Sequence, residues 1–430
     1  MNTQLYKHQI DGLEAVKDLN KVAFYWDMGL GKTFAGSEKM MQLGAKINLV
    51  VCQKSKIDDW CEHFLGHYHD KALTLDLTNY AGIGLFLNDA ITDMKIGIIN
   101  YDLLWRRPEL LKLKDFTLLL DESSLIQTET AKRSKFILKM QPKNVILLSG
   151  TPTGGKYEKL WSQLHLLGWK ISKDLYWKQF VKVTYLDTMQ GRSIPIVTGY
   201  KNIDRLKRKM ADFGCQFLKT DEVFDLPDQV FQKVQIQASV EYRKFRQTGI
   251  VTLDVQYSVE EGYNLIGDTT LTKMLGERML CGIYSEAKLK AFSDLIDSTE
   301  DRLIVFYNFT QELNLMMSVC DNAGRPYSIV NGSKRDLTAY DKHDDSVTFV
   351  QYQAGAMGLN LQKACRMIFF TLPLSSELFE QAKKRIHRIG QDRPCFYYEL
   401  ICKGTIEEKI LRTLEMRKNY TEKLFEKDEP

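Results

Sequence analysis

Residues 22–33 of the chain read Val22-Ala-Phe-Tyr-Trp26-Asp-Met-Gly-Leu-Gly-Lys-Thr33, an apolar run followed at once by a glycine-rich turn. The apolar run is typical of a strand that is covered on both faces in a parallel sheet. In the turn, glycines let backbone N–H groups face phosphate oxygens, Lys32 can reach the β and γ phosphates, and the Thr33 hydroxyl can ligate magnesium. Trp26 stands where the strict motif has its first glycine. The prediction of a phosphate-binding loop therefore rests on the change from strand to helix around the Gly-Lys-Thr triplet.

Similar apolar runs recur along the chain and alternate with helix-like stretches. This alternation predicts an α/β fold with two parallel-sheet domains of similar build. The runs of the first domain are Val22–Trp26, Ile47–Cys52, Ile96–Tyr101, Phe116–Leu120 and Val145–Leu148, and those of the second are Arg302–Tyr307, Pro326–Val330, Val347–Tyr352, Arg366–Thr371 and Cys395–Cys402.

The domain boundaries are expected near residues 153 and 226, which gives a first domain at 1–153 and a second at 226–430. Residues 154–225 are rich in aromatic residues and carry the basic run Arg205-Leu-Lys-Arg-Lys209, which favours a helical insertion. Its aromatic residues are expected to pack in a core rather than to stack on bases. The second domain is expected to begin with helices and to end in an amphipathic brace helix within Thr405–Lys427.

The composition excludes several classes of protein. Charged residues make up 27% and hydrophobic residues 44% of the 430, which argues against a disordered or fibrous chain. The 59 basic residues against 55 acidic ones give a net charge of +4, which permits nucleic acid as a partner without arguing for it. The eight cysteines form no Cys-x-x-Cys pair, and no apolar run approaches the roughly 18 residues that a membrane span needs. We expect a protein without a membrane anchor, in the cytoplasm of a bacterium or a phage-infected cell, or in the nucleus of a eukaryote.

A second chemical signal is Leu118-Leu-Leu-Asp-Glu122, an apolar strand that ends in paired acids. A carboxylate at a buried strand end is costly unless it meets a cation, and Asp121 would meet one by holding the magnesium ion of a bound nucleotide. Glu122 would then orient or deprotonate the attacking water. An acidic turn is the plainer interpretation for an isolated pair, but these acids follow a phosphate loop in the same α/β unit.

The third signal is Gln381-Ala-Lys-Lys-Arg385-Ile-His-Arg388-Ile-Gly-Gln391, in the second domain. We expect a helix over Ser375–Ile389, on which Arg385 and Arg388 would project from one face. Their guanidinium groups could neutralise charge on a transferring γ-phosphate. An isolated basic run would more often be a solvated helix face, but the phosphate site of the first domain still lacks its arginine.

Taken together, the motifs resemble those of a Swi/Snf-type ATPase of helicase superfamily two, from Leu5 to about Lys418. The matching segments, in order, are Leu5–Gly12, Asp27–Thr33, Leu49–Trp60, Ile99–Tyr101, Asp121–Glu122, Ser149–Pro152, Ile304–Phe306, Val330–Ser333, Ala354–Leu361 and Gln381–Gln391. The resemblance implies two tandem RecA-like domains. It also implies ATP and Mg²⁺ as cofactors and double-stranded DNA as the partner.

The resemblance also implies roles for individual residues. Catalytic roles fall to Lys32, Asp121, Glu122, Gln381, Arg385 and Arg388; nucleotide binding to Gln9, Gly29, Gly31, Lys32, Thr33 and Gly358; magnesium binding to Thr33 and Asp121; and nucleic-acid contacts to Lys54, Asn100, Tyr101, Thr151, Gln353 and Ala354. Gln9 would read the adenine edge.

Three positions depart from the pattern of the family. Ser124 stands where relatives often carry histidine, Gln53 replaces a proline, and Thr371-Leu-Pro-Leu lacks a tryptophan. None of them is one of the expected catalytic residues, although Ser124 leaves open a different coupling of hydrolysis to motion. The compact chain looks more like the stand-alone bacterial and bacteriophage members than like a nucleosome remodeller.

The function that these patterns predict is ATP-driven translocation along double-stranded DNA, without sequence specificity, by a monomer. Two alternatives stay open: a helicase that separates or anneals strands, and a switch in which ATP gates DNA binding. A metal site at Cys61, His63, His67 and His69 is not expected, because the spacing matches no common zinc frame.

Overall fold

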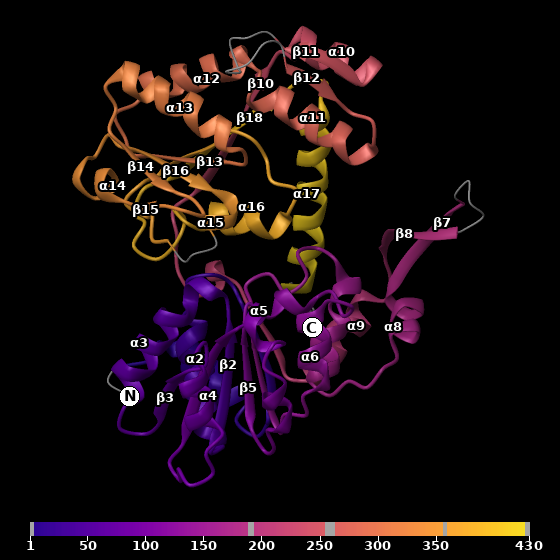
Figure 1. Cartoon of the computed structure of the whole chain (residues 1–430), viewed down its shortest axis with the longest axis vertical. Coiled ribbons are helices and arrows are strands. Elements are labelled where there is room, and N and C mark those ends of the chain that lie inside the picture. Colours follow the sequence, from indigo (N-terminus) through magenta and orange to yellow (C-terminus); the bar gives the residue numbers. More distant parts are fainter. Residues whose placement is uncertain (1–3, 188–192, 254–262, 356–358, 426–430) are drawn as a thin grey trace. The chain divides into compact units, whose positions relative to one another are not determined.

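The computed structural model describes residues 4–187, 193–253, 263–355 and 359–425. The chain divides into two compact units, Met1–Val223 with Asn419–Pro430, and Phe224–Lys418 (Figure 1). Each unit is built on a seven-stranded sheet with helices packed against it. Among the described residues, no helix is both long enough and apolar enough to cross a lipid bilayer.

The sheet of the first unit is parallel throughout and has the strand order β3-β4-β2-β5-β6-β1-β9. Its strands are β1 (Lys21–Trp26), β2 (Ile47–Cys52), β3 (Leu73–Asp76), β4 (Lys95–Asn100), β5 (Thr117–Asp121), β6 (Asn144–Leu148) and β9 (Cys215–Leu218). The helices around it are α1 (Lys7–Ala15), α2 (Lys32–Leu43), α3 (Ile57–Tyr68), α4 (Tyr80–Phe86), α5 (Tyr101–Leu104) and α6 (Lys132–Lys139). The five predicted strands of this domain are all present, within a residue or two of their expected ends.

The segment that follows β6 is not purely helical. It contains α7 (Trp161–Leu166), α8 (Lys173–Phe180), the hairpin strands β7 (Val181–Asp187) and β8 (Ser193–Tyr200), α9 (Ile203–Asp212) and then β9, which joins the main sheet beside β1. Tyr157, Tyr176 and Phe180 are fully buried in the same hydrophobic core as the sheet. Core packing of these aromatic residues is thus confirmed.

The sheet of the second unit has the order β10-β18-β17-β13-β16-β14-β15 and is parallel except for β15. Its strands are β10 (Gln229–Ile236), β13 (Leu303–Tyr307), β14 (Tyr327–Val330), β15 (Arg335–Asp336), β16 (Val347–Gln351), β17 (Arg366–Phe369) and β18 (Cys395–Cys402), with a separate hairpin of β11 (Ile250–Leu253) and β12 (Tyr263–Ile266). The five predicted strands of this domain are again present. The prediction missed β10, the edge strand that runs parallel to β18.

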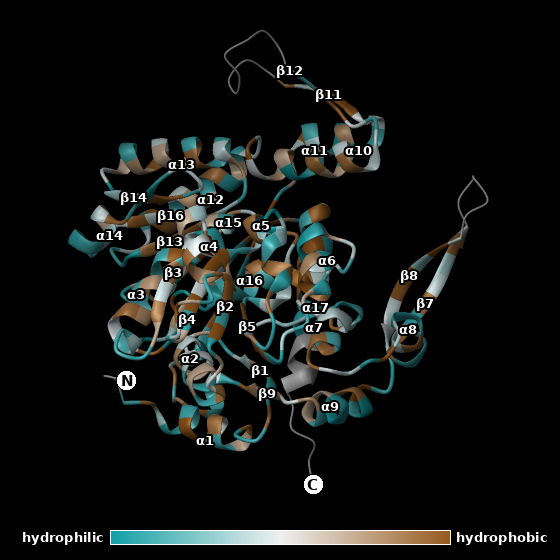
Figure 2. Ribbon diagram, turned by 60° about the horizontal axis from the view of Figure 1, so that its bottom comes forward, coloured by the Kyte–Doolittle hydropathy of each residue, from teal (hydrophilic) through white to brown (hydrophobic). Residues whose placement is uncertain are grey.

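The helices of the second unit lie on both faces of the sheet and at its end. They are α10 (Val240–Thr248), α11 (Thr270–Gly282), α12 (Glu286–Asp297), α13 (Thr310–Ala323), α14 (Thr338–Lys342), α15 (Tyr352–Gly355), α16 (Ser376–Lys383) and the part of α17 (Ile406–Phe425) that ends at Lys418. Figure 2 shows that helices such as α13 carry hydrophobic and hydrophilic residues together, as expected for a helix that buries one side. Ile410, Leu411 and Leu414 place the first turns of α17 in the core of this unit.

Candidate active site

Three chain segments with polar side chains meet at one edge of the first sheet. In that sheet β6 lies between β5 and β1, and the register pairs Leu148 of β6 with both Asp121 and Phe24. Because the three strands are parallel, their carboxyl ends lie together, and this is where open α/β sheets bind ligands. The glycine-rich loop after β1, the acids at the end of β5 and the Ser149–Pro152 segment after β6 are therefore neighbours.

The loop between β1 and α2 has the predicted strand-to-helix setting. Gly31 is the residue just before α2 and adopts a left-handed conformation, with φ of 68°, and Gly29 has φ of 87°. Gln9 of α1 donates a hydrogen bond from Nε2 to the carbonyl oxygen of Gly31 at 3.1 Å, while its Oε1 accepts one from the backbone N–H of Tyr6 at 2.8 Å. The structure thus brings Gln9 against the loop. Its contact with an adenine edge stays a prediction.

Lys32 is the first residue of α2 and is held inside the loop. Its Nζ donates hydrogen bonds to the carbonyl oxygens of Trp26 at 2.9 Å and Asp27 at 3.0 Å. A Cβ placed on Gly150, after β6, would lie 3.6 Å from the same Nζ. The ammonium group therefore sits between the loop and the segment after β6, where the phosphates of a nucleotide would offer anionic oxygens in place of the two carbonyls.

Asp121 is a half-buried carboxylate close to this ammonium group. Its Oδ2 accepts a hydrogen bond from Trp60 Nε1 at 2.9 Å. Burial raises the pKa of Asp121 above its ordinary value, and the hydrogen bond from Trp60 and the positive charge of Lys32 partly oppose this. A further cation at this carboxylate would favour its charged form.

Glu122 follows in a strained backbone conformation. Its φ is 52°, in the left-handed region that residues other than glycine seldom adopt. Ser149 Oγ donates to Glu122 Oε2 at 3.4 Å, and Tyr101 OH donates to the carbonyl oxygen of Asp121 at 2.8 Å. The turn after β5 is thus held from two sides, and its unusual conformation aims the Glu122 side chain toward the segment after β6.

The donor set suits the magnesium ion that the family resemblance implies. The Thr33 hydroxyl and the Asp121 carboxylate are hard oxygen donors of the kind that Mg²⁺ prefers, and it normally keeps waters and substrate phosphates as its other ligands. The half-buried Asp121 carboxylate, with its raised pKa, is a group that a cation would stabilise.

The four predicted nucleic-acid contacts of this unit differ in exposure. Lys54 is exposed, just after β2. Asn100 ends β4 and is mostly buried, and Thr151 is buried with an Oγ1 that has no hydrogen-bond partner among the described residues. Tyr101 begins α5 and is buried, with its hydroxyl committed to Asp121. Of the four side chains, only Lys54 lies open at the surface, and the contacts themselves stay predictions.

In the second unit, the expected helix over Ser375–Ile389 is wrong in its second half. α16 ends at Lys383, so Arg385 and Arg388 do not lie on a helix face. Arg385 is buried, whereas Arg388 is half-buried and donates from Nη1 to Asn360 Oδ1 at 2.5 Å. Burial lowers the pKa of Arg388. Gln381 is buried on α16 itself, and its Oε1 has no hydrogen-bond partner within the described ranges.

The early end of α16 has a tertiary cause. Gln391 Nε2 donates to three backbone carbonyl oxygens, those of Gln362, Ala364 and Ile386, at 2.8–3.2 Å. Gly390 takes φ of 91°, and His387 Nε2 lies 2.8 Å from the carbonyl oxygen of Pro227. These contacts hold the chain in turns where local sequence favours helix. The other predicted residues of this unit lie at α15, where Gln353 is exposed and Ala354 is buried, while Gly358 is outside the described residues.

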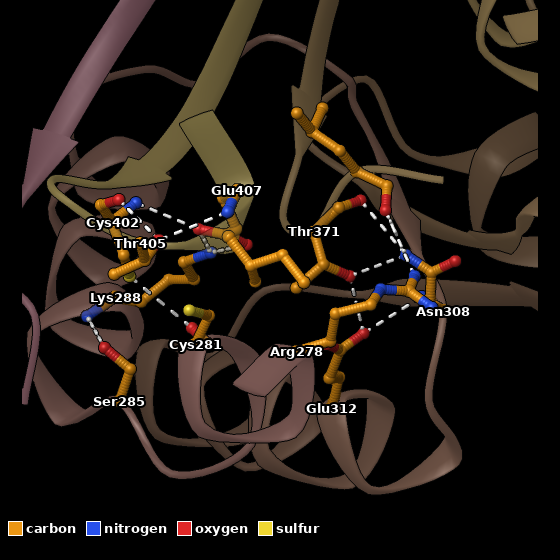
Figure 3. Close-up of polar contacts among 12 residues, drawn as sticks. Arg278, Cys281, Ser285, Lys288, Asn308, Glu312, Thr371, Cys402, Thr405 and Glu407 are labelled. Carbon is orange, nitrogen blue, oxygen red and sulfur yellow. Dashed lines mark hydrogen bonds and ion pairs between the residues drawn. The ribbon is translucent and has the colours of Figure 1, made fainter. Parts of the chain in front are cut away.

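A buried polar network lies elsewhere in the second unit (Figure 3). Cys281, Cys402 and Glu407 have ligand atoms within 4.8 Å of one another, which would suit a metal. Lys288 Nζ, however, donates to both oxygens of Glu407, at 2.5 and 2.7 Å, and so neutralises the carboxylate without an ion. In α3, the Nε2 atom of His63 lies 2.9 Å from Ser37 Oγ, and burial lowers the pKa of His63 to about 4.

Two residues of the site had no assigned role in the sequence interpretation. In the sequence, Trp60 is only the last residue of a motif, and its hydrogen bond to Asp121 joins residues 61 positions apart. Ser149 belonged to a recognised motif, but its contact with Glu122 depends on the neighbouring places of β5 and β6. The place of Trp60 at the end of a motif in the nucleotide-binding domain is the sequence feature that could have indicated its role in the site.

Comparison with known proteins identifies the class of the chain. Residues 9–282 match the SNF2-related domain and residues 287–390 match the helicase conserved C-terminal domain. The chain therefore belongs to the SNF2-related family, the Swi/Snf-type ATPases of helicase superfamily two.

Individual proteins that are similar to the chain share low sequence identity with it or match only part of it. The mouse SWI/SNF-related matrix-associated actin-dependent regulator of chromatin subfamily A member 1 is 22% identical over 91% of this chain and 40% of its own length. The DNA repair and recombination protein RDH54 of Saccharomyces cerevisiae is 32% identical over 33% of this chain and 16% of its own length. This chain thus spans less than half of these relatives. A solved Sulfolobus solfataricus SWI2/SNF2 ATPase core in complex with dsDNA covers 98% of this chain and 93% of that one, at 19% identity and a TM-score of 0.46.

Proposed function

We propose that this protein hydrolyses ATP and couples the hydrolysis to movement along double-stranded DNA. The observation that carries the proposal is the meeting of Lys32, Asp121 and Glu122 at one edge of a parallel sheet, in a chain of the SNF2-related family. A phosphate-binding lysine, a carboxylate for magnesium and a second carboxylate for water are the parts that phosphoryl transfer to water requires.

Each residue has a distinct part in the proposed reaction. Lys32 would leave the carbonyl oxygens of Trp26 and Asp27 and neutralise the β and γ phosphates. Thr33 and Asp121 would hold the magnesium ion, which supplies further neutralisation of phosphate charge. Glu122 would orient the attacking water and accept its proton.

The proposal gives the second domain the arginines. Residues 1–153 and 226–430 would act as two lobes, and Gln381, Arg385 and Arg388 would engage the γ-phosphate when the lobes close around it. Arg388 has its guanidinium tied to Asn360 and only half-buried, so it can exchange that partner for an anionic one. Hydrolysis would release the lobes, and each cycle would move one along the DNA relative to the other.

The DNA contacts would be made mainly to phosphates. Such contacts carry little sequence information, so binding is expected to be nearly independent of sequence and to weaken steeply with salt. Duplex DNA as the substrate is supported by the family, and the name of the yeast relative, a DNA repair and recombination protein, agrees with a DNA substrate. We propose that the protein works as a monomer.

The decisive experiment measures steady-state ATP hydrolysis with duplex DNA, single-stranded DNA and RNA in parallel. Stimulation by duplex DNA above the other two supports the proposal. Displacement of a triplex-forming strand without unwinding of a forked duplex would separate translocation from strand separation. A rate of hydrolysis that DNA does not change would instead favour an ATP-gated binding switch, and would overturn the proposal.

A further inference from the structure

Gln163 is a fully buried glutamine on α7 whose amide is hydrogen-bonded at both ends. Its Oε1 accepts hydrogen bonds from Ser123 Oγ at 2.8 Å and from Tyr25 OH at 3.0 Å. Its Nε2 donates to the carbonyl oxygen of Pro152 at 2.8 Å. All three bonds are buried, so water does not compete for them.

The three partners belong to the three segments that build the active site. Tyr25 precedes the phosphate loop on β1, Ser123 directly follows Glu122, and Pro152 ends the segment that begins at Ser149. Gln163 itself lies outside every motif that the sequence analysis singled out.

Two of these hydrogen bonds complete a closed ring of contacts that includes Glu122, the residue proposed to activate water. The ring runs from Glu122 through its neighbour Ser123 to Gln163, on to Pro152, back along the chain to Ser149, and from Ser149 Oγ to Glu122 Oε2 at 3.4 Å. Glu122 needs such support because its backbone φ of 52° is an unfavourable conformation that the surrounding structure must impose.

We infer that Gln163 is a positioning residue for ATP hydrolysis: it fixes the distance between the turn that carries Glu122 and the segment that carries Ser149. This inference rests on the proposed function, because it assigns Gln163 to the same hydrolytic step. As a positioning residue, Gln163 would contact neither the nucleotide nor the attacking water and would act only through Ser123 and Pro152.

The chemistry of the position demands an amide of this length. Leucine would fill a similar volume but would leave the Ser123 and Tyr25 hydroxyls without an acceptor in a buried site. Glutamate could accept from both hydroxyls, but it could not donate to the carbonyl oxygen of Pro152. Only a side chain with both an acceptor and a donor can bind the Ser123 hydroxyl and the Pro152 carbonyl oxygen at the same time.

The test compares four variants: Gln163→Leu, Ser123→Ala, the double variant S123A/Q163L, and Tyr25→Phe. Gln163→Leu and Ser123→Ala break the ring, so kcat for DNA-stimulated ATP hydrolysis should fall at least about tenfold while KM for ATP stays unchanged. Tyr25→Phe removes a bond to the same Oε1 outside the ring, so it should lower the melting temperature and leave kcat unchanged.

The double variant separates positioning from packing. It replaces a polar pair with an apolar pair, so its melting temperature should recover toward the wild-type value relative to Gln163→Leu, while kcat stays low. Recovery of kcat together with the melting temperature, or a loss in Tyr25→Phe equal to that in Ser123→Ala, would show a merely structural role and overturn the inference. If the wild type hydrolyses ATP and Gln163→Leu and Ser123→Ala keep its kcat, the inference alone is refuted. If the wild type does not hydrolyse ATP, the proposed function is refuted and the inference with it.

Discussion

Gln9 Nε2 lies 3.1 Å from the carbonyl oxygen of Gly31, so a side chain of the first helix is bonded to the last residue of the phosphate loop. A Cβ placed on Gly31 would lie only 2.2 Å from that same Nε2. The loop therefore needs glycine at position 31 for two reasons. The φ of 68° is unfavourable for other residues, and Gln9 occupies the space that a Cβ would need.

We predict that Gly31→Ala weakens ATP binding markedly, because the methyl group must displace Gln9 from the loop. The matched control is Gly44→Ala at the other end of α2, where φ is 62° and nothing lies within 4 Å of the added Cβ. Both variants should lose about 1–2 kcal/mol of stability to the left-handed backbone. Titration with a fluorescent ATP analogue should show weakened binding only for Gly31→Ala, and equal affinities for the two variants would contradict the prediction.

Glu122→Gln should retain ATP affinity and lose turnover, because the amide keeps the shape of the side chain but cannot accept a proton from water. ATP binding and single-turnover hydrolysis, measured on the same preparation, check this. Glu62→Gln, at an exposed glutamate of α3, provides a control that should turn over normally. Normal turnover of Glu122→Gln would remove the residue from the proposed role.

Breaking the buried pair of Lys288 and Glu407 should strongly destabilise the second unit. Their side chains are 0% and 3% exposed, so Lys288→Met leaves a carboxylate buried without its cation. We expect a loss of about 3–5 kcal/mol in the free energy of unfolding, measured with urea. Lys290→Met breaks an exposed pair with Asp294 on the same helix and should cost less than about 1 kcal/mol. Similar losses of unfolding free energy in the two variants would contradict the prediction that burial makes the loss of Lys288 more costly.

Glu312 should make the stability of the second unit depend on pH. Burial raises its pKa to about 7, although backbone N–H groups of Asn308 and Phe309 donate to its carboxylate. Because the folded-state pKa exceeds the unfolded one of about 4.3, the folded protein binds the extra proton. This contribution to stability is complete below pH 4 and is lost as the pH rises through 7.

The variant Glu312→Gln replaces the carboxyl group with an amide, which does not ionise in this pH range. Its free energy of unfolding relative to wild type should therefore rise between pH 5 and pH 8, as followed by urea unfolding at four pH values. A constant difference across this range would mean that Glu312 is charged throughout.

Most strands could be predicted from the sequence because they are buried on both faces. Runs such as Ile47–Cys52 and Cys395–Cys402 are almost wholly apolar, and their bounds agree with β2 and β18. β10 was missed because it is an edge strand with mainly exposed residues, and its pairing with β18 joins segments far apart in the chain. The strands of the 154–225 segment were missed because aromatic and basic residues suggested helices.

The site could be predicted as a set of motifs but not as a set of contacts. The local sequence pattern placed Lys32 at the start of a helix and Asp121 and Glu122 at the end of a strand. The bonds of Trp60 to Asp121 and of Gln163 to Ser123 depend on how distant segments pack, and no local pattern specifies them. The helix predicted through Arg385 and Arg388 failed for the same reason, because Gln391 binds three backbone carbonyls and holds the chain in turns.

We propose that the two domains supply different parts of one hydrolytic site, and the rate of DNA-stimulated ATP hydrolysis in Arg388→Ala tests this proposal most directly. We predict a fall in kcat of about 10³-fold or more, with ATP and duplex DNA still bound. The control is Arg393→Ala, five residues after Arg388, which removes an exposed arginine that is paired with Asp301 and should keep the wild-type rate. Wild-type turnover in Arg388→Ala would contradict the account.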